Sequence, residues 1–96
     1  MVYEWNAAKA KANIQKHGVS FDEAATVFLD PLAFTFADPD HSGGEAREIT
    51  IGYTTRHRVV FVSHGHRGDR IRIISARNVT RRERRQYEEG TDQEIG

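Results

Sequence analysis

The spacing of hydrophobic positions changes along the chain and divides it into a helical part and a strand-rich part. After a short aromatic strand at residues 2–5, Ala7, Ala10 and Ile14 repeat at the spacing of one helix face. From residue 32 onward, apolar residues alternate with polar ones or form short runs, as they do in strands. The pattern predicts the element order β-α-α-β-β-β-β-α.

Local end signals define the first two helices. Asn6 is a favourable N-cap for the first helix, and Gly18 is placed to end it in the left-handed conformation. Residues 20–23, Ser-Phe-Asp-Glu, form a capping box that begins the second helix. The Asp-Pro pair at residues 30–31 is expected to stop it, because a residue before proline avoids the helical conformation.

The remaining elements are four strands and a closing helix. The strands are predicted at residues 32–37, 48–53, 59–62 and 70–77, with turns at residues 54–57 and 64–69. The run at 59–62 is apolar on both faces and should be a central strand, whereas 32–37 fits an edge strand. A second capping box at residues 80–83 opens a helix that is expected to run to about Glu89 and to stop at Gly90.

These elements predict an α+β fold, with one antiparallel sheet, two N-terminal helices on one face and a C-terminal helix. The 96 residues suffice for one hydrophobic core and leave no room for a second. We expect residues 1–90 to form a single domain and residues 91–96 to be a flexible tail.

Composition narrows the class of protein. The chain has no cysteine, which excludes disulfides, thiolate metal sites and cysteine nucleophiles. No apolar run approaches the length of a membrane-spanning helix, and the N-terminus lacks the apolar centre of a signal peptide. We therefore expect a cytoplasmic protein with no membrane partner.

The formal net charge of zero conceals a strong asymmetry. Residues 47–87 hold eleven arginines, no lysine and three acids, whereas the segments before and after them each carry a net charge of −4. A guanidinium binds phosphate through two parallel hydrogen bonds, which a lysine cannot match. The arginine block as a whole favours a phosphate-rich partner, although for any single arginine a solvated, salt-bridged surface is the better interpretation.

The last predicted strand concentrates this charge. Its alternation puts Arg70 and Arg72 on one face and Ile71 and Ile73 on the other. If helices cover the isoleucines, two guanidiniums project from the open face of the sheet. The alternative is that these arginines pair with a carboxylate across the sheet, for example Glu48. Strict alternation puts Arg77 on the isoleucine face, and a β-bulge would be needed to redirect it.

The closing helix adds further arginines. Arg81 and Arg85 share one of its faces, and Tyr87 lies behind them. Such a run is usually a solvated helix face, but here it directly follows the arginine-bearing strand. Arginines near aromatic rings such as Tyr87 and Trp5 suit single-stranded nucleic acid, whose bases stack on rings and whose backbone attracts cations.

The chain contains five histidines, which is many for its length. His57, His64 and His66 fall in predicted turns, where exposed histidines need no special function, and no spacing typical of a zinc site is present. His17 lies at the end of the first helix, where a cation favours the helix dipole. His41 has acids and an arginine nearby in sequence and is the best placed for general acid–base chemistry.

Several segments of the chain resemble the BrnT toxin family. They are WNxxK from Trp5, NxxKHGVSFxEA from Asn13, VFxDP from Val27, DHxxxExR from Asp40, Gly52, and RIISARxxTxxERxxYE from Arg72. The similarity keeps the same order and spacing across residues 3–90. It implies a RelE-like fold and a ribonuclease that is the toxin of a bacterial type II toxin–antitoxin pair. It also implies a BrnA-like antitoxin that binds the toxin directly, with the complex repressing its operon on operator DNA.

The resemblance further implies RNA cleavage without a metal or other cofactor, through attack of the 2′-hydroxyl on the neighbouring phosphate. Arginines would stabilise the charge of the phosphorane, and histidines would transfer protons. The catalytic residues expected are Arg47, Arg72, Arg77, His17 and His41. The RNA-binding residues expected are Trp5, Lys16, Arg81, Arg85 and Tyr87.

The residues also permit a different function. A non-catalytic basic module would use the same arginines only to bind an acidic protein partner or nucleic acid. Such a module would need no histidine near its arginines. A neighbouring reading frame for a small DNA-binding protein would favour the toxin.

Overall fold

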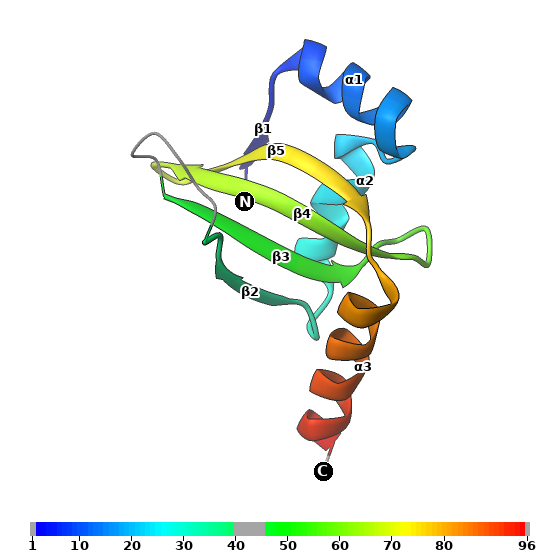
Figure 1. Ribbon diagram of the computed structural model, residues 1–96. Helices are drawn as coiled ribbons and strands as arrows, with labels where there is room; N and C mark the ends of the chain where they lie inside the picture. The colour runs from blue at the N-terminus through cyan, green and yellow to red at the C-terminus, as the bar shows by residue number, and fades with distance from the viewer. Residues whose placement is uncertain (1, 40–45, 96) are drawn as a thin grey trace.

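The computed structural model describes residues 2–39 and 46–95. Its elements, shown in Figure 1, are β1 (Val2–Glu4), α1 (Ala7–His17), α2 (Phe21–Ala25), the 3-10 helix η1 (Thr26–Leu29), β2 (Phe34–Ala37), β3 (Arg47–Tyr53), β4 (Val59–Arg67), β5 (Arg70–Asn78) and α3 (Arg81–Ile95). The order of helices and strands is the predicted one. None of the helices in the described ranges is long and apolar enough to cross a membrane.

The predicted helix caps are confirmed. The Asn6 side chain accepts a hydrogen bond from the Lys9 N–H, and Gly18 ends α1 with a φ of 70°. The Ser20 hydroxyl accepts from the Glu23 N–H at 3.0 Å and so satisfies one of the free donors at the start of α2. The second helix is shorter than expected, because the chain tightens into η1 before it stops at Asp30.

The sheet is mixed, so the prediction of an antiparallel sheet is wrong for one strand. Its five strands lie in the order β1-β5-β4-β3-β2. The strands β2 to β5 pair antiparallel, whereas β1 pairs parallel with β5. No hairpin connects β1 to β5, so the alternation of residues within either strand does not specify their relative direction. The predicted edge position of β2 and central position of β4 are confirmed.

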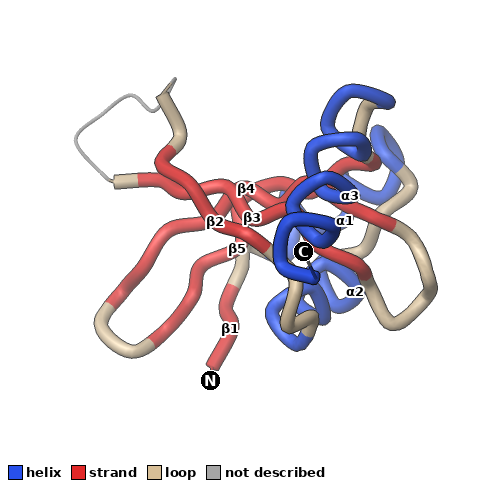
Figure 2. The backbone as a smooth tube through the Cα atoms, turned by 90° about the horizontal axis from the view of Figure 1, so that it is seen from below, coloured by secondary structure: helices blue, strands red, loops and turns tan. Residues whose placement is uncertain are grey.

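Each face of the sheet has its own hydrophobic cluster. On the face covered by α1, α2 and η1, called the α2 face below, the buried residues are Val19, Phe21, Ala24, Val27, Val60, Val62, Ile73 and Ala76. On the opposite face, called the α3 face, Ile49, Ile51 and Val59 pack with partly buried neighbours that include Phe61 and Tyr87. Each fully buried side chain of this size contributes about 1.5–3 kcal/mol. In Figures 1 and 2 the helices gather toward one end of the strands, and the β4–β5 hairpin lies at the other end.

A close approach between η1 and β3 explains one glycine. A Cβ atom at Gly52 would lie 2.9 Å from the Cβ of Ala33 and 3.1 Å from the Cβ of Val27. Both distances are shorter than ordinary contacts between carbon atoms, which are about 3.5–4.0 Å. Glycine at this position therefore lets η1 and Ala33 pack closely against β3.

A β-bulge in β5 reorients the residues after it. The pairing between β4 and β5 shifts by one residue beside Ser63 and His64, which leaves Ile74 as the extra residue. After the shift, Ala76 lies on the α2 face with Ile73, and Arg77 lies opposite Phe61 on the α3 face. Strict alternation would put Arg77 on the α2 face with Ile73. The bulge places it on the α3 face instead.

The strand β4 is longer than predicted. It runs to Arg67, so the predicted turn at residues 64–69 is wrong except for its last two residues. Pairing with β3 on one side and β5 on the other keeps this segment extended. As a result His64 is buried, with 1% of its surface exposed, and is not the exposed turn histidine that the sequence predicted. His66 lies in the strand and is exposed, and His57 lies in an exposed turn as expected.

The helix α3 passes through its predicted end. It continues beyond Gly90 to Ile95, so the stop expected at Gly90 is wrong. A glycine ends a helix when it adopts a positive φ, and the glycines with positive φ in the described ranges are Gly18 and Gly68. In a helical conformation, glycine costs about 1 kcal/mol relative to alanine without ending the helix. Whether residues 91–96 form a flexible tail stays a prediction.

Candidate functional site

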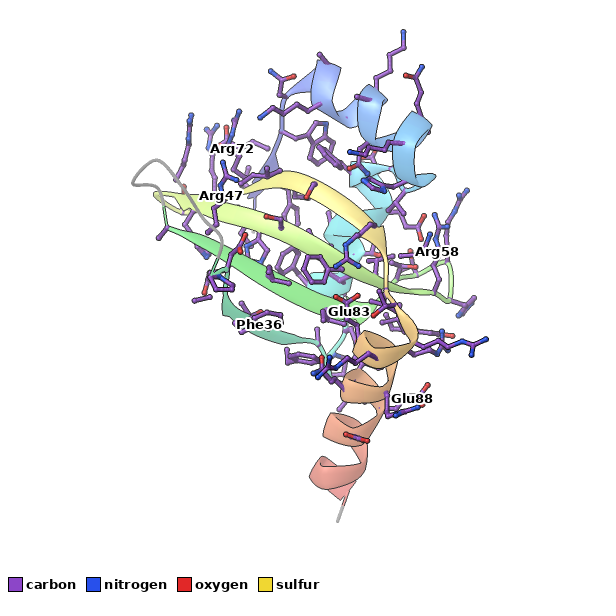
Figure 3. All side chains as sticks on the ribbon, viewed as in Figure 1. Phe36, Arg47, Arg58, Arg72, Glu83 and Glu88 are labelled. Atoms are coloured by element: carbon purple, nitrogen blue, oxygen red, sulfur yellow. The ribbon has the colours of Figure 1, made fainter. Side chains whose placement is uncertain are left out.

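Two arginines flank a glycine in one row across the α3 face. Arg47 on β3 and Arg72 on β5 both pair with Gly65 on β4, so all three positions point to the same side of the sheet. Because Gly65 has no side chain, nothing from β4 stands between the two arginine side chains. Figure 3 shows Arg47 and Arg72 near each other at the end of the sheet that the helices leave uncovered.

A groove of about 490 Å³ extends from Arg47 in this row to Glu83 at the start of α3. It is lined by Phe36, Asp38, Pro39, Arg47, Ile49, Phe61, Ser63, Ile74, Ser75, Arg77 and Glu83. Ser63 and Ser75 are directly paired in the sheet and place two hydroxyl groups on its floor. The groove thus combines polar hydroxyls, apolar walls and arginines at both ends.

At the α3 end of the groove, Arg77 is held by Glu83. Its Nη1 and Nη2 atoms donate to the two carboxylate oxygens at 2.8 and 2.9 Å, and its guanidinium lies 3.9 Å from the ring centre of Phe61. The hydrogen bonds with Glu83 raise the pKa of Arg77, and Arg77 lowers the pKa of Glu83. Both side chains are therefore charged at neutral pH.

Arg72 and Arg47 are less firmly bound than Arg77. The Nη1 atom of Arg72 lies 4.0 Å from the carboxylate of Glu4, its neighbour on β1. Arg72 therefore has a carboxylate partner across the sheet, but it is Glu4 and not Glu48, which points to the other face. The Nε atom of Arg47 is buried and makes no hydrogen bond with the residues that the structure describes. A buried donor without a partner is costly, and an anion bound in the groove would satisfy it.

The structure brings together three of the five predicted catalytic residues. Arg47 and Arg77 line the groove, and Arg72 stands in the same row as Arg47. His17 ends α1 and does not line the groove. His41 lies outside the described residues, so its place relative to the groove is untested.

The predicted RNA-binding residues are more scattered. Trp5 packs edge-to-face on Phe21 within the α2-face cluster, with ring centres 6.0 Å apart, and Lys16 is exposed on α1. Arg81 and Arg85 are exposed on α3.

Tyr87 has a clear structural contact. Its hydroxyl donates to Asp30 Oδ2 at 2.7 Å, and burial together with this carboxylate raises its pKa. Asp30 also accepts from the backbone N–H groups of Leu32 and Tyr53. Tyr87 therefore joins α3 to the segment that follows η1.

Sequence reasoning missed three polar residues of the groove. Glu83 was identified only as a capping residue, and it does accept from the Thr80 N–H at 2.9 Å. Ser63 and Ser75 carry no motif, and their pairing depends on the register of two strands. One sequence signal could have predicted the Arg77–Glu83 pair. The two residues are six apart, at the end of a predicted strand and the start of a predicted helix.

One group of residues in the described ranges has the composition of a metal site. Glu48, His64 and His66 lie together on the α2 face, away from the groove. Burial lowers the pKa of His64 to about 4, so its ring is neutral at neutral pH. The described residues that line the groove include no histidine, and of their two carboxylates Glu83 is held by Arg77.

Comparisons with known proteins agree with the resemblance seen in the sequence. The family model described as the ribonuclease toxin BrnT of type II toxin–antitoxin systems matches residues 5–83. The 1.1 Å crystal structure of the Brucella abortus ribonuclease toxin BrnT superposes with a TM-score of 0.64 at 21% sequence identity, covering 84% of this chain and 100% of that one. A comparison with curated protein sequences finds no match. The structural likeness shows a shared fold, and the family match spans most of the sequence, so the chain belongs to the BrnT family of ribonuclease toxins of type II toxin–antitoxin systems.

Proposed function

We propose that the groove on the α3 face is the active site of an endoribonuclease that cleaves RNA without a metal ion. The observation that carries the proposal is a groove lined by Arg47, Arg77 and two serines, with Arg72 in the same row of the sheet as Arg47. Positioned cations stabilise the charge that develops on a phosphorane, usually the largest single contribution to such catalysis. The membership of a ribonuclease toxin family supports the same assignment.

In the proposed reaction, the 2′-hydroxyl of one nucleotide attacks the adjacent phosphorus atom. A bond forms from the 2′-oxygen to phosphorus, the bond to the 5′-oxygen breaks, and the products are a 2′,3′-cyclic phosphate and a 5′-hydroxyl. Arg47 and Arg72 bind the phosphate, and Arg47 gains a partner for its buried Nε atom. Arg77 stabilises the phosphorane from the other end of the groove.

Proton transfer in this reaction needs an acceptor for the 2′-hydroxyl proton and a donor for the 5′-oxygen. Glu83 lines the groove and its carboxylate is ionised at neutral pH, so we assign it as the acceptor. The sequence predicted His41 and His17 as proton-transfer residues without assigning which donates, and we assign them here as the candidate donors. Proton transfer by a positioned group contributes about 10²–10⁴-fold to the rate.

RNA outside the reacting phosphate would contact exposed residues. Arg81 and Arg85 on α3 and Lys16 on α1 are exposed cations that can bind the backbone. Trp5 and Tyr87 stay in the proposed RNA-binding set, although their contacts within the fold leave less of each ring to stack on a base.

The proposal includes a partner and a cellular setting. A BrnA-like antitoxin would neutralise the enzyme by binding it directly, and the complex would bind operator DNA. We further propose a RelE-like fold and a cytoplasmic location, where RNA is available as substrate. The family description, a type II toxin–antitoxin system, supports an antitoxin encoded beside the toxin.

Inducible expression in a bacterial host tests this function. The free chain should arrest growth and generate new RNA 5′ ends, and co-expression of the neighbouring antitoxin should prevent both effects. Arg47→Ala should restore growth, whereas Arg67→Ala, which removes an exposed arginine from the β4–β5 hairpin, should not. In vitro, cleavage should persist in excess EDTA.

Two results would contradict the proposal. Intact transcripts at high levels of folded protein would favour the non-catalytic basic module. Cleavage that is lost in EDTA and restored by added metal would exclude the metal-independent mechanism.

A further inference from the structure

The cluster of Glu48, His64 and His66 lies on the opposite side of the sheet from the groove. His64 and His66 are two residues apart on β4, so both point to the α2 face, and Glu48 on β3 is paired directly with His64. One potential ligand atom from each residue lies within 4.8 Å of the other two. Arg47 precedes Glu48 on β3 and points the other way, so this cluster is separate from the proposed active site.

His64 presents one ring nitrogen that has no hydrogen-bond partner in the described structure. Its Nε2 atom lies 2.7 Å from the Thr50 hydroxyl, which is 2.7 Å from the Thr35 hydroxyl. Only 1% of the residue is exposed, so water does not replace the missing partner of its buried Nδ1 atom. Phe28 packs edge-to-face on the ring, with centres 5.0 Å apart, and helps to fix its orientation.

This arrangement matches the surroundings of a metal-binding histidine. In such sites one ring nitrogen binds the ion, while the other is held by a hydroxyl, carbonyl or carboxylate that fixes the ring. The hydroxyls of Thr50 and Thr35 provide that support at the Nε2 side of His64. The unpaired Nδ1 atom is then the nitrogen available to an ion.

The other two residues can adjust around an ion. His66 Nε2 and Glu48 Oε1 are 2.6 Å apart, and their side chains are 54% and 38% exposed. A transition metal lies about 2.0–2.2 Å from nitrogen and oxygen ligands, so modest rotations of these two exposed side chains would complete the site. Their exposure also leaves room for water in the remaining coordination positions.

We propose that Glu48, His64 and His66 form a binding site for a divalent transition-metal ion, with Zn²⁺ as the best fit. Two imidazoles and one carboxylate suit Zn²⁺ and related ions, whereas Mg²⁺ and Ca²⁺ prefer sites made of oxygen ligands. The ion would connect β3 to β4 beside the bulge, at the level where Arg47, Gly65 and Arg72 are aligned on the other face. Its effect would be on the stability of this end of the sheet.

Metal titration of the tag-free, chelator-treated full chain tests the site. Calorimetry with Zn²⁺ and visible absorption with Co²⁺ should each report one ion per chain. His66→Ala and Glu48→Gln should each weaken binding at least about tenfold, the usual scale for altering a metal site. His57→Asn is the matched control, because it removes an exposed histidine whose φ of 66° asparagine tolerates.

Thermal melts separate loss of the site from loss of the fold. His66→Ala and Glu48→Gln change exposed side chains, so both should melt like the metal-free wild type. Added Zn²⁺ should raise the melting temperature of the wild type and of His57→Asn but not of the other two variants. Undiminished binding in His66→Ala, equal loss in His57→Asn, or no stoichiometric binding would each overturn the site. None of these measurements depends on RNA cleavage.

Discussion

Two arginine–glutamate pairs in this molecule are built from the same sequence motif. Glu23 and Glu83 each end a capping box, in which a serine or threonine hydroxyl accepts from the glutamate N–H. Each glutamate then holds an arginine through two hydrogen bonds. The atoms of Arg58 lie 2.6 Å from Glu23, and those of Arg77 lie 2.8 and 2.9 Å from Glu83.

The surroundings of the two pairs differ. The side chain of Glu23 is 4% exposed and also accepts from the Thr54 hydroxyl at 2.9 Å, while Arg58 Nη2 also donates to the Gly18 carbonyl. All of these groups belong to the fold. Glu83 and Arg77, in contrast, line the groove and remain open to a ligand.

The comparison shows that a capping box does not determine the role of its glutamate. That role depends on where the first turn of the helix meets the sheet. The first turn of α2 lies within the core, so its glutamate closes a buried network that connects α2 to the β3–β4 hairpin. The first turn of α3 lies beside the groove. There Glu83 can release Arg77 to bind RNA and can itself accept a proton.

Replacing each arginine by alanine tests this difference most strongly. Arg77→Ala should lower RNA cleavage by about 10²–10³-fold, the usual cost of removing one donor that stabilises a transition-state charge. Arg58→Ala should leave the cleavage rate per folded molecule unchanged, because Arg58 lies outside the groove. The measurement is a single-turnover cleavage assay beside a thermal melt for both variants.

Stability should follow the opposite order in these two variants. Arg58→Ala leaves a buried carboxylate unpaired and should cost about 3 kcal/mol, the lower end of the range for broken buried pairs. Arg77→Ala loses its bonds to Glu83 and its contact with Phe61, which should cost about 1–2 kcal/mol. If the activity of Arg77→Ala falls only in proportion to its folded fraction, Arg77 is structural and the assignment fails.

Removing the charge of each glutamate sharpens the same comparison. Glu23→Gln should lower the free energy of unfolding by about 2–3 kcal/mol at neutral pH, because Arg58 loses its charged acceptor. For a domain of this size, that loss corresponds to a fall in melting temperature of roughly 10 °C or more. Glu83→Gln should cost less, because glutamine can still cap the Thr80 N–H.

The pH dependence of the melts provides the control. Arg58 lowers the pKa of Glu23 below its usual value of 4.5, so the pair stabilises the fold above that value. The stabilisation is lost as the pH falls through the lower pKa of the folded state. The difference between the wild type and Glu23→Gln should therefore shrink steadily from pH 5 to pH 3. A constant difference over this range would mean that the charge of Glu23 does not stabilise the fold.

The sequence predictions are accurate for features that depend on residues close together in the chain and fail for features that depend on distant residues. The caps at Asn6, Gly18 and Ser20 were predicted correctly because each involves residues within one turn of helix. The parallel direction of β1 was missed and the bulge at Ile74 was left undecided, because both depend on pairing between distant strands. Strand alternation alone cannot reveal either of them.

The same limit applies to the candidate site. Alternation singled out Arg72, and the resemblance to the BrnT family added Arg47 and Arg77, but only the bulge puts Arg77 on the same face as Arg72. His64 and His66 were expected in an exposed turn, because Gly65 between them is typical of turns. Pairing of β4 on both sides keeps this glycine in a strand, which buries His64 beside Glu48.

The smallest effect is expected for Arg82→Ala, an arginine on neither side of the comparison. Arg82 is exposed in the first turn of α3, one residue before Glu83, and does not line the groove. A cation near a helix N-terminus opposes the helix dipole, so its removal should leave the stability unchanged or raise it by about 0.3 kcal/mol. Cleavage should stay within about a factor of three of the wild type, because a solvated charge away from the reacting phosphate adds only screened attraction. A loss as large as that of Arg77→Ala, measured in the same assay, would mean that RNA is processed along α3, and the groove would no longer be the site supported best.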